Sequence, residues 1–589
     1  MRSLFILSLF ILTYVNSLSA RTVVVISTQS DFDHIPEKIA SVMKSSNRDI
    51  YITIAPGRYI VKENGFSLNK LEAHGKNFHI SGNGTILVPD GRKYKNGERY
   101  EGTFSPENSW MSGKMDINIW SHVRYADGLV EVVNEKSKLC RLKSKEPLQK
   151  GLDVSNAFIL LTHWYQSSVY KIYKIESDYI YFTATDLSNG YRKGYNVNDD
   201  YNVAGLNPRY KLCNLEIGED YLRIIDGRLV LPSGISSVWE GVANRMLSVN
   251  YSQFKSLDVS GICFYGCSNT KGSFGISIAD VNSDYVRIHH CEFRGFHSRV
   301  FYVASNDVII ENNVFTDCYE SGINSYNSSE RTIVKGNSFY MMGKRMSNSF
   351  CVSCHGPEFI VDSNTFLDFG FDGIGAGESH RNHPEKKSYG LIQNNTLSYS
   401  SEYLLDVANY TIMDSGAIYL RTRNDGVVIQ NNYIYDITGM YENRGIYCDN
   451  GAYGFSLIGN IVTGISNSNC IASRRDASGE ESRMQGSGIV ATNVNNVVKN
   501  NVVDGGIQFV GNEKPDNGCV FSYNFLLLGE GEEMPINSIK NILDEEGLVV
   551  LTHTGEKRGR IGISRASYKK LKTSEEWKRI KKFFVRKNI

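Results

Sequence analysis

Proline is scarce in this sequence: 11 of the 589 residues are proline, against 53 glycines. Many glycines suit short strands joined at tight corners and suit long helices poorly. The 35 tyrosines and 27 phenylalanines favour strands as well, because aromatic side chains pack well on pleated surfaces. With 41% hydrophobic residues the chain can bury a large core, which excludes bulk disorder.

An excess of one charge is also missing. The 64 Lys and Arg residues nearly cancel the 63 Asp and Glu residues, which leaves a net charge of +1. A chain so close to neutrality has no general electrostatic attraction to nucleic acid. We therefore expect no nucleic-acid partner.

Long apolar runs are absent after the first twenty residues, so we expect no membrane span in the mature chain. At the start, Met1 and Arg2 precede an apolar run from Leu4 to Val15, and small residues end the segment at Ala20. This order is typical of a secretory signal peptide over residues 1–20. An uncleaved N-terminal anchor is the alternative. A signal peptide implies that the protein is secreted or periplasmic.

The chain has few cysteines for its length, and their number, 11, is odd. Proteins stabilised by disulfides usually have many closely spaced cysteines in an even number. Cys351, Cys354 and His355 have the spacing of half a zinc site, but no second pair follows. A disulfide or two inert thiols is the competing interpretation. We expect no metal and no cofactor.

A short phrase recurs through the middle of the chain: an apolar residue, two polar residues, Asn, any residue, and an apolar residue. The copy at Ile310–Phe315 is an example, and Cys291 holds the Asn position one coil earlier. The intervals run from 23 residues (501 to 524) to 41 residues (460 to 501). The recurring asparagines are Asn313, Asn337, Asn364, Asn395, Asn432, Asn460, Asn501 and Asn524.

A constant phrase at variable intervals indicates a repeated core rung joined by loops of different lengths. The fold class we predict is all-β: a right-handed parallel β-helix, a solenoid with rungs about 4.8 Å apart. Asn suits the corner of each rung because it tolerates left-handed backbone and bonds its neighbours, so stacked asparagines would form a ladder. A set of unrelated Asn-rich loops is the alternative.

A second phrase precedes each Asn phrase: a small residue followed by Ile, as in Gly373-Ile374 and Gly445-Ile446. Strand side chains alternate between faces, so if Ile points into the core, the residues one and three later point outward. The first outward row is Asn324, Gly375, Tyr419, Tyr447, Val490 and Gln508. The second outward row is Tyr326, Gly377, Arg421, Asp449, Thr492 and Val510. The middle of this surface is polar and aromatic, which predicts an active groove.

We predict five segments along the chain. They are a signal peptide (1–20), an N-terminal cap with the first coils (21–90), an inserted β-rich domain (91–250), the β-helix with the groove (251–535) and a C-terminal extension (536–589). The cap should contain a helix at Asp31–Ser46 and a strand at Tyr51–Tyr59. The insert should contain strands near Phe158–Trp164, Val169–Ala184 and Arg228–Pro232. The extension should end in a basic helix after the capping box at Thr573–Glu576.

Three segments carry a resemblance to a known family: Asp414–Tyr419 (DSGAIY), Val428–Ile437 (VIQNNYIYDI) and Gly445–Gly451 (GIYCDNG). Together they resemble the signature of exported right-handed β-helix proteins related to glycoside hydrolase family 141, which includes fucosidase and xylanase activities. The resemblance implies that Asp414 and Asp449 are the two catalytic carboxylates. The chain departs from the pattern with Asn450 after Asp449, with the basic run from Arg421, and with Asp372-Gly373 where relatives often have His.

The chemistry supports the same pair. Glycoside hydrolysis uses one protonated and one ionised carboxyl group across the scissile bond. Arg421 one rung away would keep Asp449 ionised, as a nucleophile or base requires, whereas desolvation would keep Asp414 protonated as an acid. The competing interpretations are a backbone-capping carboxylate for Asp414 and a surface ion pair with Arg421 for Asp449. Glu378 is the reserve candidate.

Four side chains complete the predicted site as substrate-binding residues together with Glu378: Arg421, Asp372, Tyr419 and Tyr447. The two tyrosines would be stacking platforms for sugars, with packed surface aromatics as the alternative. The function we predict is a secreted glycoside hydrolase that acts on a plant or microbial polysaccharide. A polysaccharide lyase and a non-catalytic glycan-binding β-helix are the alternatives, and the sequence leaves the oligomeric state open.

Overall fold

The structure is a computed structural model of the chain, and it describes residues 21–552 with gaps. The gaps are residues 46–48, 63–64, 107, 113–114, 117–118, 123, 129, 135, 149–152, 164–165, 185–208, 216–220, 244, 268–273, 327, 344–348, 378–388, 401–414, 421–425, 438–443, 449–453, 464–471, 476–480, 485–486, 493–496, 500, 504–506, 511–519, 523 and 529–547. Among the described residues, no helix has the length and apolar character to cross a membrane.

The chain forms two compact units, each built from two stretches of sequence. Unit 1 combines Met1–Ile119 with Ile217–Met342, and unit 2 combines Trp120–Glu216 with Gly343–Ile589. The predicted insert at 91–250 therefore contributes to both units. The five predicted segment boundaries stay a prediction, and the expected helix after Thr573 lies outside the described residues.

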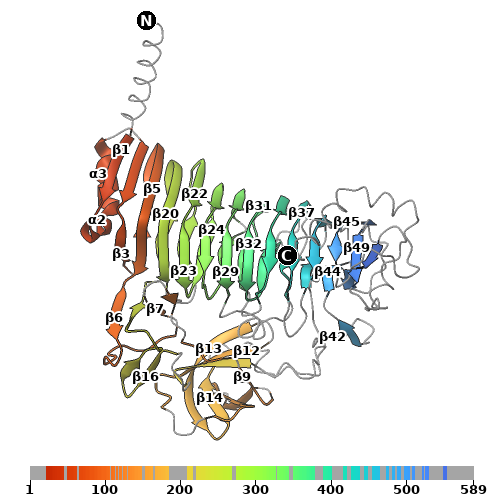
Figure 1. Cartoon of the computed structure of the whole chain (residues 1–589). Helices are drawn as coiled ribbons and strands as arrows, with labels where there is room; N and C mark the ends of the chain where they lie inside the picture. The colour runs from red at the N-terminus through yellow and green to blue at the C-terminus, as the bar shows by residue number, and fades with distance from the viewer. Residues whose placement is uncertain are drawn as a thin grey trace. The chain divides into compact units, whose positions relative to one another are not determined.

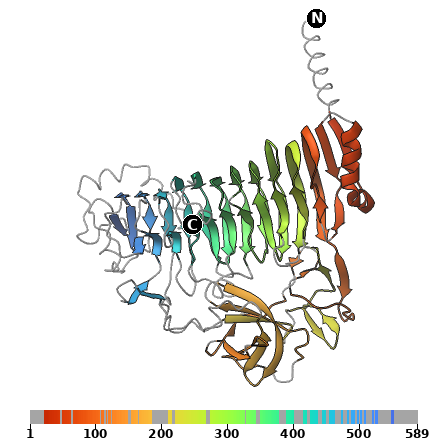
Figure 2. The same cartoon turned by 180° about the vertical axis from the view of Figure 1, so that it is seen from behind.

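Unit 1 contains parallel coils with three strand positions per coil, which lie side by side in Figures 1 and 2. The first position holds β1 (Arg21–Ile26), β2 (Asp49–Ile54), β5 (Glu72–Pro89), β20 (Gln253–Cys267), β22 (Tyr285–His289), β25 (Val308–Glu311) and β28 (Thr332–Lys335). The second holds β3 (Gly57–Val61), the ends of β5 and β20, β23 (Glu292–Phe296), β26 (Val314–Thr316) and β29 (Ser338–Met342). The third holds β4 (Phe66–Ser67), β19 (Leu247–Asn250), β21 (Phe274–Ala279), β24 (Arg299–Ala304) and β27 (Ile323–Ser325).

A column of phenylalanine rings fills the interior of these coils. Phe264 stacks on Phe293 with ring centroids 5.1 Å apart, Phe293 on Phe315 at 4.9 Å, and Phe315 on Phe339 at 4.5 Å. All four side chains are buried, because in-register parallel pairing places one ring above the next. Burial of a Phe side chain contributes roughly 1.5–3 kcal/mol, so this column is a substantial part of the core.

The N-terminal cap has two short helices where one was predicted. α2 (Gln29–Asp33) begins with a capping box between Thr28 and Asp31, and α3 runs over Ile35–Ser45. The prediction of a single helix from Asp31 was wrong because the chain breaks at His34. Proline lacks a backbone N–H, so Pro36 fits the first turn of a new helix and not the interior of a longer one.

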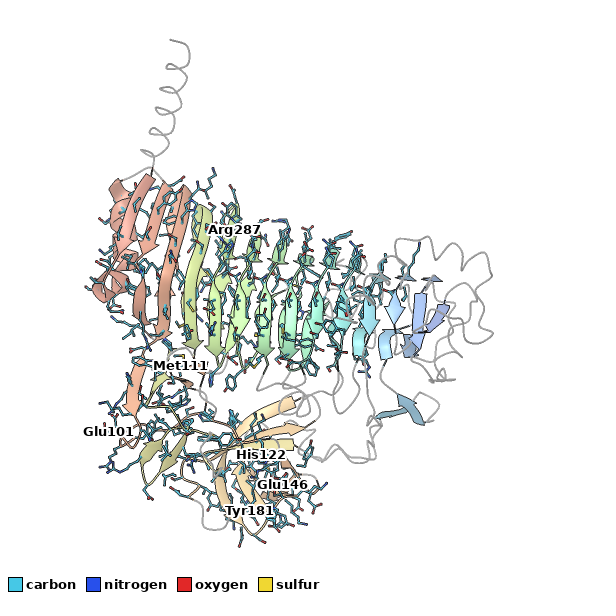
Figure 3. The ribbon with its side chains drawn as sticks, viewed as in Figure 1. Glu101, Met111, His122, Glu146, Tyr181 and Arg287 are labelled. Atoms are coloured by element: carbon cyan, nitrogen blue, oxygen red, sulfur yellow. The ribbon has the colours of Figure 1, made fainter. Side chains whose placement is uncertain are left out.

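A small four-stranded sheet in unit 1 packs on the outside of the coils. It is formed by β6 (Gly91–Lys95), β18 (Ser237–Gly241), β7 (Ser109–Ser112) and β8 (Met115–Asp116), with the hairpin of β16 (Arg223–Ile225) and β17 (Arg228–Val230) as a separate pair. Met111, labelled in Figure 3, packs against Val88 of β5 and Tyr265 of β20. Beneath it, buried Glu240 accepts hydrogen bonds from Tyr100 Oη at 2.7 Å and Asn108 Nδ2 at 2.8 Å.

Unit 2 contains an antiparallel seven-stranded sheet, as predicted for part of the insert. Its order is β10 (Glu131–Asn134), β11 (Leu139–Lys143), β14 (Tyr179–Thr183), β13 (Gln166–Glu176), β12 (Phe158–His163), β15 (Arg209–Cys213) and β9 (Arg124–Tyr125). The strand predicted over 169–184 is two strands, because Ser177 turns with a left-handed φ of 57°. Glu146 Oε2 lies 3.6 Å from His122 Nε2 and 3.2 Å from Arg124 Nη1; Glu146 and His122 are labelled in Figure 3.

The coils of unit 2 repeat the same three positions. The first holds β31 (Glu358–Asp362), β34 (Tyr389–Gln393), β37 (Val427–Gln430), β40 (Ser456–Ile458), β45 (Val497–Lys499) and β48 (Val520–Ser522). The second holds β32 (Thr365–Phe369), β35 (Thr396–Ser398), β38 (Tyr433–Tyr435), β41 (Ile461–Thr463), β46 (Val502–Val503), β49 (Asn524–Leu528) and β50 (Leu548–Thr552). The third holds β30 (Phe350–Cys354), β33 (Asp372–Ala376), β36 (Ile418–Leu420), β39 (Arg444–Cys448), β44 (Ser487–Thr492) and β47 (Ile507–Val510), and β42 (Ala472–Arg475) forms a separate hairpin with β43 (Glu481–Met484).

The predicted asparagine ladder is present in both units. In unit 1 the side-chain amide of Asn313 donates to Asn337 Oδ1 at 3.1 Å. In unit 2 the ladder continues through four buried links of 2.9–3.0 Å: Asn364 to Asn395, Asn395 to Asn432, Asn432 to Asn460, and Asn460 to Asn501. The backbone N–H of Cys291 donates to Asn313 Oδ1, which confirms that Cys291 occupies the same position. The pairing of Val502 with Phe525 gives Asn524 the register of Asn501.

One part of the corner prediction was wrong. The left-handed residue is the one before each ladder position and not the ladder asparagine itself. The positions with positive φ are His290, Asn312, Gly336, Ser363, Asn394, Asn431 and Gly459. The residue before each Asn makes the sharp bend, and the Asn side chain is left to bond along the stack. This division explains why the preceding position is often Asn or Gly.

Candidate functional site

The third strand position of unit 2 has the register that the sequence predicted for the groove. Val352, Ile374, Ile418, Ile446, Ile489 and Ile507 pair in one row along the stack, and the first four of these side chains are buried. The next residues of these strands also pair in a row. Five of them belong to the predicted first outward row (Gly375, Tyr419, Tyr447, Val490 and Gln508), and Ser353 holds the corresponding place in β30. The common register predicted from the Gly-Ile phrase is therefore confirmed in these coils, while the outward direction of the second row stays a prediction.

Four of the predicted site residues lie outside the described residues: Asp414, Asp449, Arg421 and Glu378. Their neighbours in sequence are described. Leu420 pairs with Cys448, and Arg421 and Asp449 are the next residue after each. Asp414 precedes Ser415 and Gly416, the segment that leads into β36. The roles of these residues stay predictions.

Asp372 is fully buried and bonds to the segment that follows Asp414. Its Oδ1 accepts a hydrogen bond from the backbone N–H of Gly416 at 2.8 Å. Gly416 must be glycine because a Cβ there would lie 2.8 Å from Tyr447 Cβ. Asp372 therefore helps to fix the backbone two residues after Asp414. Its predicted contact with substrate stays a prediction, since the side chain has no exposed surface in this structure.

The two predicted stacking tyrosines contact each other. Tyr419 and Tyr447 meet edge to face with ring centroids 5.3 Å apart, and the guanidinium of Arg444 lies 3.9 Å from the Tyr447 ring centre. Tyr419 is 7% exposed and Tyr447 is 2% exposed. Burial to this extent favours the packed-aromatic alternative, and the sugar-stacking role of both rings stays a prediction.

Sequence reasoning did not single out Phe350, which completes this aromatic cluster. Its ring lies 6.3 Å from the Tyr419 ring. Phe350 also fills the space over Gly375, where a Cβ would lie 2.4 Å from the ring. The signal was Gly375 itself, because a glycine in an outward row leaves room for a neighbouring side chain. Arg444, two residues before Ile446, was missed because no phrase marks it.

Cys351, Cys354 and His355 have the spacing of half a zinc site, and the structure describes all three. Within the described ranges, no group of three or more His, Cys, Asp or Glu side chains could hold a metal ion. Cys351 and Cys354 are buried and form no disulfide among the described cysteines, and burial raises the pKa of Cys354 to about 12. Both behave as small apolar core residues, while His355 Nε2 is 2.6 Å from Ser353 Oγ.

Comparison with known proteins agrees with the fold. The family described as "Right handed beta helix region" matches residues 235–366. No curated protein matches the sequence. A solved glycoside hydrolase is 10% identical, with a TM-score of 0.47, and the similarity covers 85% of this chain and 96% of that one.

Two other solved structures have the same kind of similarity. The catalytic domain of a GH87 alpha-1,3-glucanase in complex with nigerose is 11% identical, with a TM-score of 0.25 and coverage of 74% and 96%. The tailspike protein of E. coli bacteriophage HK620 in complex with hexasaccharide is 9% identical, with a TM-score of 0.30 and coverage of 91% and 79%. Similarities at this level carry no conclusion about the chemistry of this chain.

Proposed function

We propose that this chain is an exported glycoside hydrolase that cleaves a glycosidic bond in a plant or microbial polysaccharide with Asp414 and Asp449. One observation carries the proposal. β36 and β39 pair in parallel with Ile418 opposite Ile446, and these two strands belong to the segments that hold the two aspartates. The proposal places the two carboxylates on these neighbouring rungs.

Neighbouring rungs suit this reaction. Adjacent strands lie about 4.8 Å apart. The two carboxyl groups of a glycosidase lie about 5–5.5 Å apart for retention of configuration and about 6.5–9.5 Å apart for inversion. Along the strands, the pairing of Ile418 with Ile446 puts Asp414 seven residues from the position opposite Asp449. The proposal therefore requires the chain to turn at Ser415-Gly416, where Asp372 accepts from the Gly416 N–H, to bring the two carboxyl groups within this range.

The two carboxyl groups have different roles in the proposal. Asp449 acts as nucleophile or base. Leu420 pairs with Cys448, so Arg421 and Asp449 follow paired residues of adjacent rungs. The positive charge of Arg421 keeps Asp449 ionised. Asp414 acts as general acid. Asp372 supports it by fixing the Gly416 backbone from a buried position. Glu378, which follows Gly377 at the end of the β33 segment, is the reserve carboxylate.

Two sequence features support the proposed substrate class and location. The resemblance to family 141 favours fucosylated or xylan-type glycans, and residues 1–20 favour a secreted or periplasmic enzyme. Arg421, Tyr419 and Tyr447 are proposed to bind the substrate near the carboxylates. No metal or cofactor enters the reaction, since the two carboxyl groups supply the acid and the base or nucleophile.

A reducing-sugar assay on fucosylated, xylan and pectic polysaccharides tests the proposal. We expect the wild-type protein to release reducing ends from at least one of them and Asp449→Asn to lose this activity. Asp284→Asn is the matched control, because Asp284 is exposed in unit 1, directly before β22 of the first strand position. Absorbance from a new double bond in the products would show that the enzyme is a lyase and not a hydrolase. If no glycan is cleaved, the result would favour the alternative of a non-catalytic glycan-binding protein.

A further inference from the structure

Three aromatic side chains form a cluster on the outer face of the third strand position in unit 1. Phe274 begins β21, Tyr302 lies in β24, and Tyr326 directly follows β27, so each comes from a different coil. Tyr302 pairs with Ser277 and Asn324, which puts it in the same kind of outward row that carries Tyr419 and Tyr447 in unit 2.

The three rings contact one another and remain partly exposed. The ring centroids are 4.8 Å apart for Phe274 and Tyr302, 4.7 Å for Tyr302 and Tyr326, and 6.4 Å for Phe274 and Tyr326. Ser277 and Asn324, which flank Tyr302 in its row, are buried. All three rings have intermediate exposure, in contrast to the buried Tyr419 and Tyr447.

The core of the coils does not require these rings. Phe301, the residue before Tyr302, already points inward and is fully buried against Phe293 and Phe315. The interior of the coil is therefore filled by one aromatic side chain while the next residue along the strand holds a second one outside. Aromatic side chains clustered on an outer surface commonly mark a binding site.

Charged side chains surround the cluster. The Arg299 guanidinium lies 5.6 Å from the Phe274 ring centre, its Nη1 donates to Tyr326 Oη at 3.4 Å, and its Nε is 3.7 Å from Glu320 Oε2. The Arg299 side chain is 44% exposed and that of Glu320 is 29% exposed. Burial raises the pKa of Tyr302, and the neighbouring Tyr326 and the charge of Asp280 raise it further. Asp280 is exposed.

We propose that Phe274, Tyr302 and Tyr326, with Arg299 and Glu320 at their edge, form a binding site for an uncharged polysaccharide chain, separate from the carboxylates Asp414 and Asp449. A pyranose ring offers an apolar C–H face and a rim of hydroxyl groups. The aromatic rings would pack against the C–H face. Arg299, Glu320 and the two tyrosine hydroxyls would form hydrogen bonds with the sugar hydroxyl groups.

The charges decide between neutral and acidic sugars. Arg299 is balanced by Glu320, and Asp280 adds a further negative charge near Tyr302. A uronate carboxylate would gain little from a guanidinium that is already paired, and it would be repelled by Asp280. The site therefore selects chains of neutral sugars. Successive rungs about 4.8 Å apart allow one extended chain to cross all three coils.

Affinity electrophoresis of the full chain tests this site. Gels would contain neutral polysaccharides (xylan, β-glucan, mannan) or polyuronates (polygalacturonate, alginate), and Asp449→Asn in the background prevents cleavage of the polymer. We expect at least one neutral polysaccharide to retard the protein, and Tyr302→Ala to weaken this retardation at least about tenfold. Tyr173→Ala is the matched control, since Tyr173 is 65% exposed on β13 in the other unit and should leave retardation unchanged.

Further variants keep the test decisive if Tyr302→Ala unfolds, which circular dichroism would reveal. Arg299→Gln and Tyr326→Phe remove polar groups at the edge without removing a ring, and each should weaken retardation severalfold. Retardation by polyuronates alone, or equal retardation of wild type and the ring and edge variants, would overturn the proposal. The outcome does not depend on hydrolysis: a protein that binds through Tyr302 and cleaves nothing supports this site and contradicts only the proposed catalysis.

Discussion

The buried amide of Asn432 is held from both sides of the stack. Its Nδ2 donates to Asn460 Oδ1 at 3.0 Å and to the Ile392 carbonyl oxygen at 2.9 Å, while its Oδ1 accepts from the backbone and side-chain amides of Asn395. A single side chain thus joins three coils, and every polar atom of the amide is used. Replacing this side chain by an apolar one would leave its buried partners without their hydrogen bonds.

We expect Asn432→Ala to lower the free energy of unfolding by about 3 kcal/mol, because each stranded buried polar group costs about 1–3 kcal/mol. Thermal unfolding followed by circular dichroism measures the change. Asn431→Gly is the matched control. Asn431 is exposed with a φ of 55°, which glycine adopts freely, so its melting temperature should stay near that of the wild type. Equal melting of the two variants would show that the ladder contributes nothing.

For Asp449→Asn we expect a loss of at least about 10³ in kcat, because loss of a nucleophile or base costs several kcal/mol of transition-state stabilisation. The melting temperature should barely change, since the role assigned to Asp449 involves no core contact. Initial rates and a melting curve on the same preparation test both parts. Activity within tenfold of the wild type would move the role to Glu378.

Asp414→Asn should also lower kcat, but in a way that depends on the leaving group. Substrates with very good leaving groups need no proton from a general acid, so the variant should cleave them at nearly the wild-type rate. Aryl glycosides with leaving groups of graded acidity provide the measurement. A uniform loss across the series would show that Asp414 is not the acid.

Glu240 gives a prediction about pH. Burial raises the pKa of its carboxyl group, only partly offset by the bonds from Asn108 and Tyr100. A raised pKa in the folded state means that its contribution to stability is present below the unfolded value of about 4.3 and is lost as pH rises through the folded value. We expect Glu240→Gln, which cannot ionise, to gain melting temperature relative to the wild type as pH rises through this window.

Glu101→Gln is the control for this titration. Glu101, labelled in Figure 3, belongs to the same part of unit 1. Its side chain is 66% exposed. Its melting temperature should follow that of the wild type across the same pH range. If the Glu240→Gln difference is the same at every pH, the buried carboxyl group is not the source of the pH dependence.

Repetition made the coils predictable from the sequence. The position of Asn313 in its phrase predicts the ladder because only a fixed register lets equal residues bond along a stack. The left-handed residue before it was missed, because Asn312 and Asn313 are both asparagine and the phrase does not say which one bends. The paired helices of the cap were missed because amphipathic spacing continues across the break at His34.

The surface was harder to predict than the core. The alternation rule gave the outward direction of Tyr419 and Tyr447, but Phe350 of β30 packs on Tyr419, and Arg444, three residues before Tyr447 in β39, covers the Tyr447 ring. The cluster at Tyr302 was missed because Phe301-Tyr302 lacks the small residue of the Gly-Ile phrase. Contacts across coils are set by register and not by any local pattern.

The ladder has a consequence for how the chain folds. Its links join asparagines that are 24 to 41 residues apart, so no rung can form from local contacts. Closing a flexible loop costs an entropy that grows only with the logarithm of its length, about 0.6 kcal/mol for each doubling. Long and short connections are therefore added at nearly the same cost. Once one coil exists it serves as a template for the next, and folding should proceed as stepwise growth from a single slow nucleus.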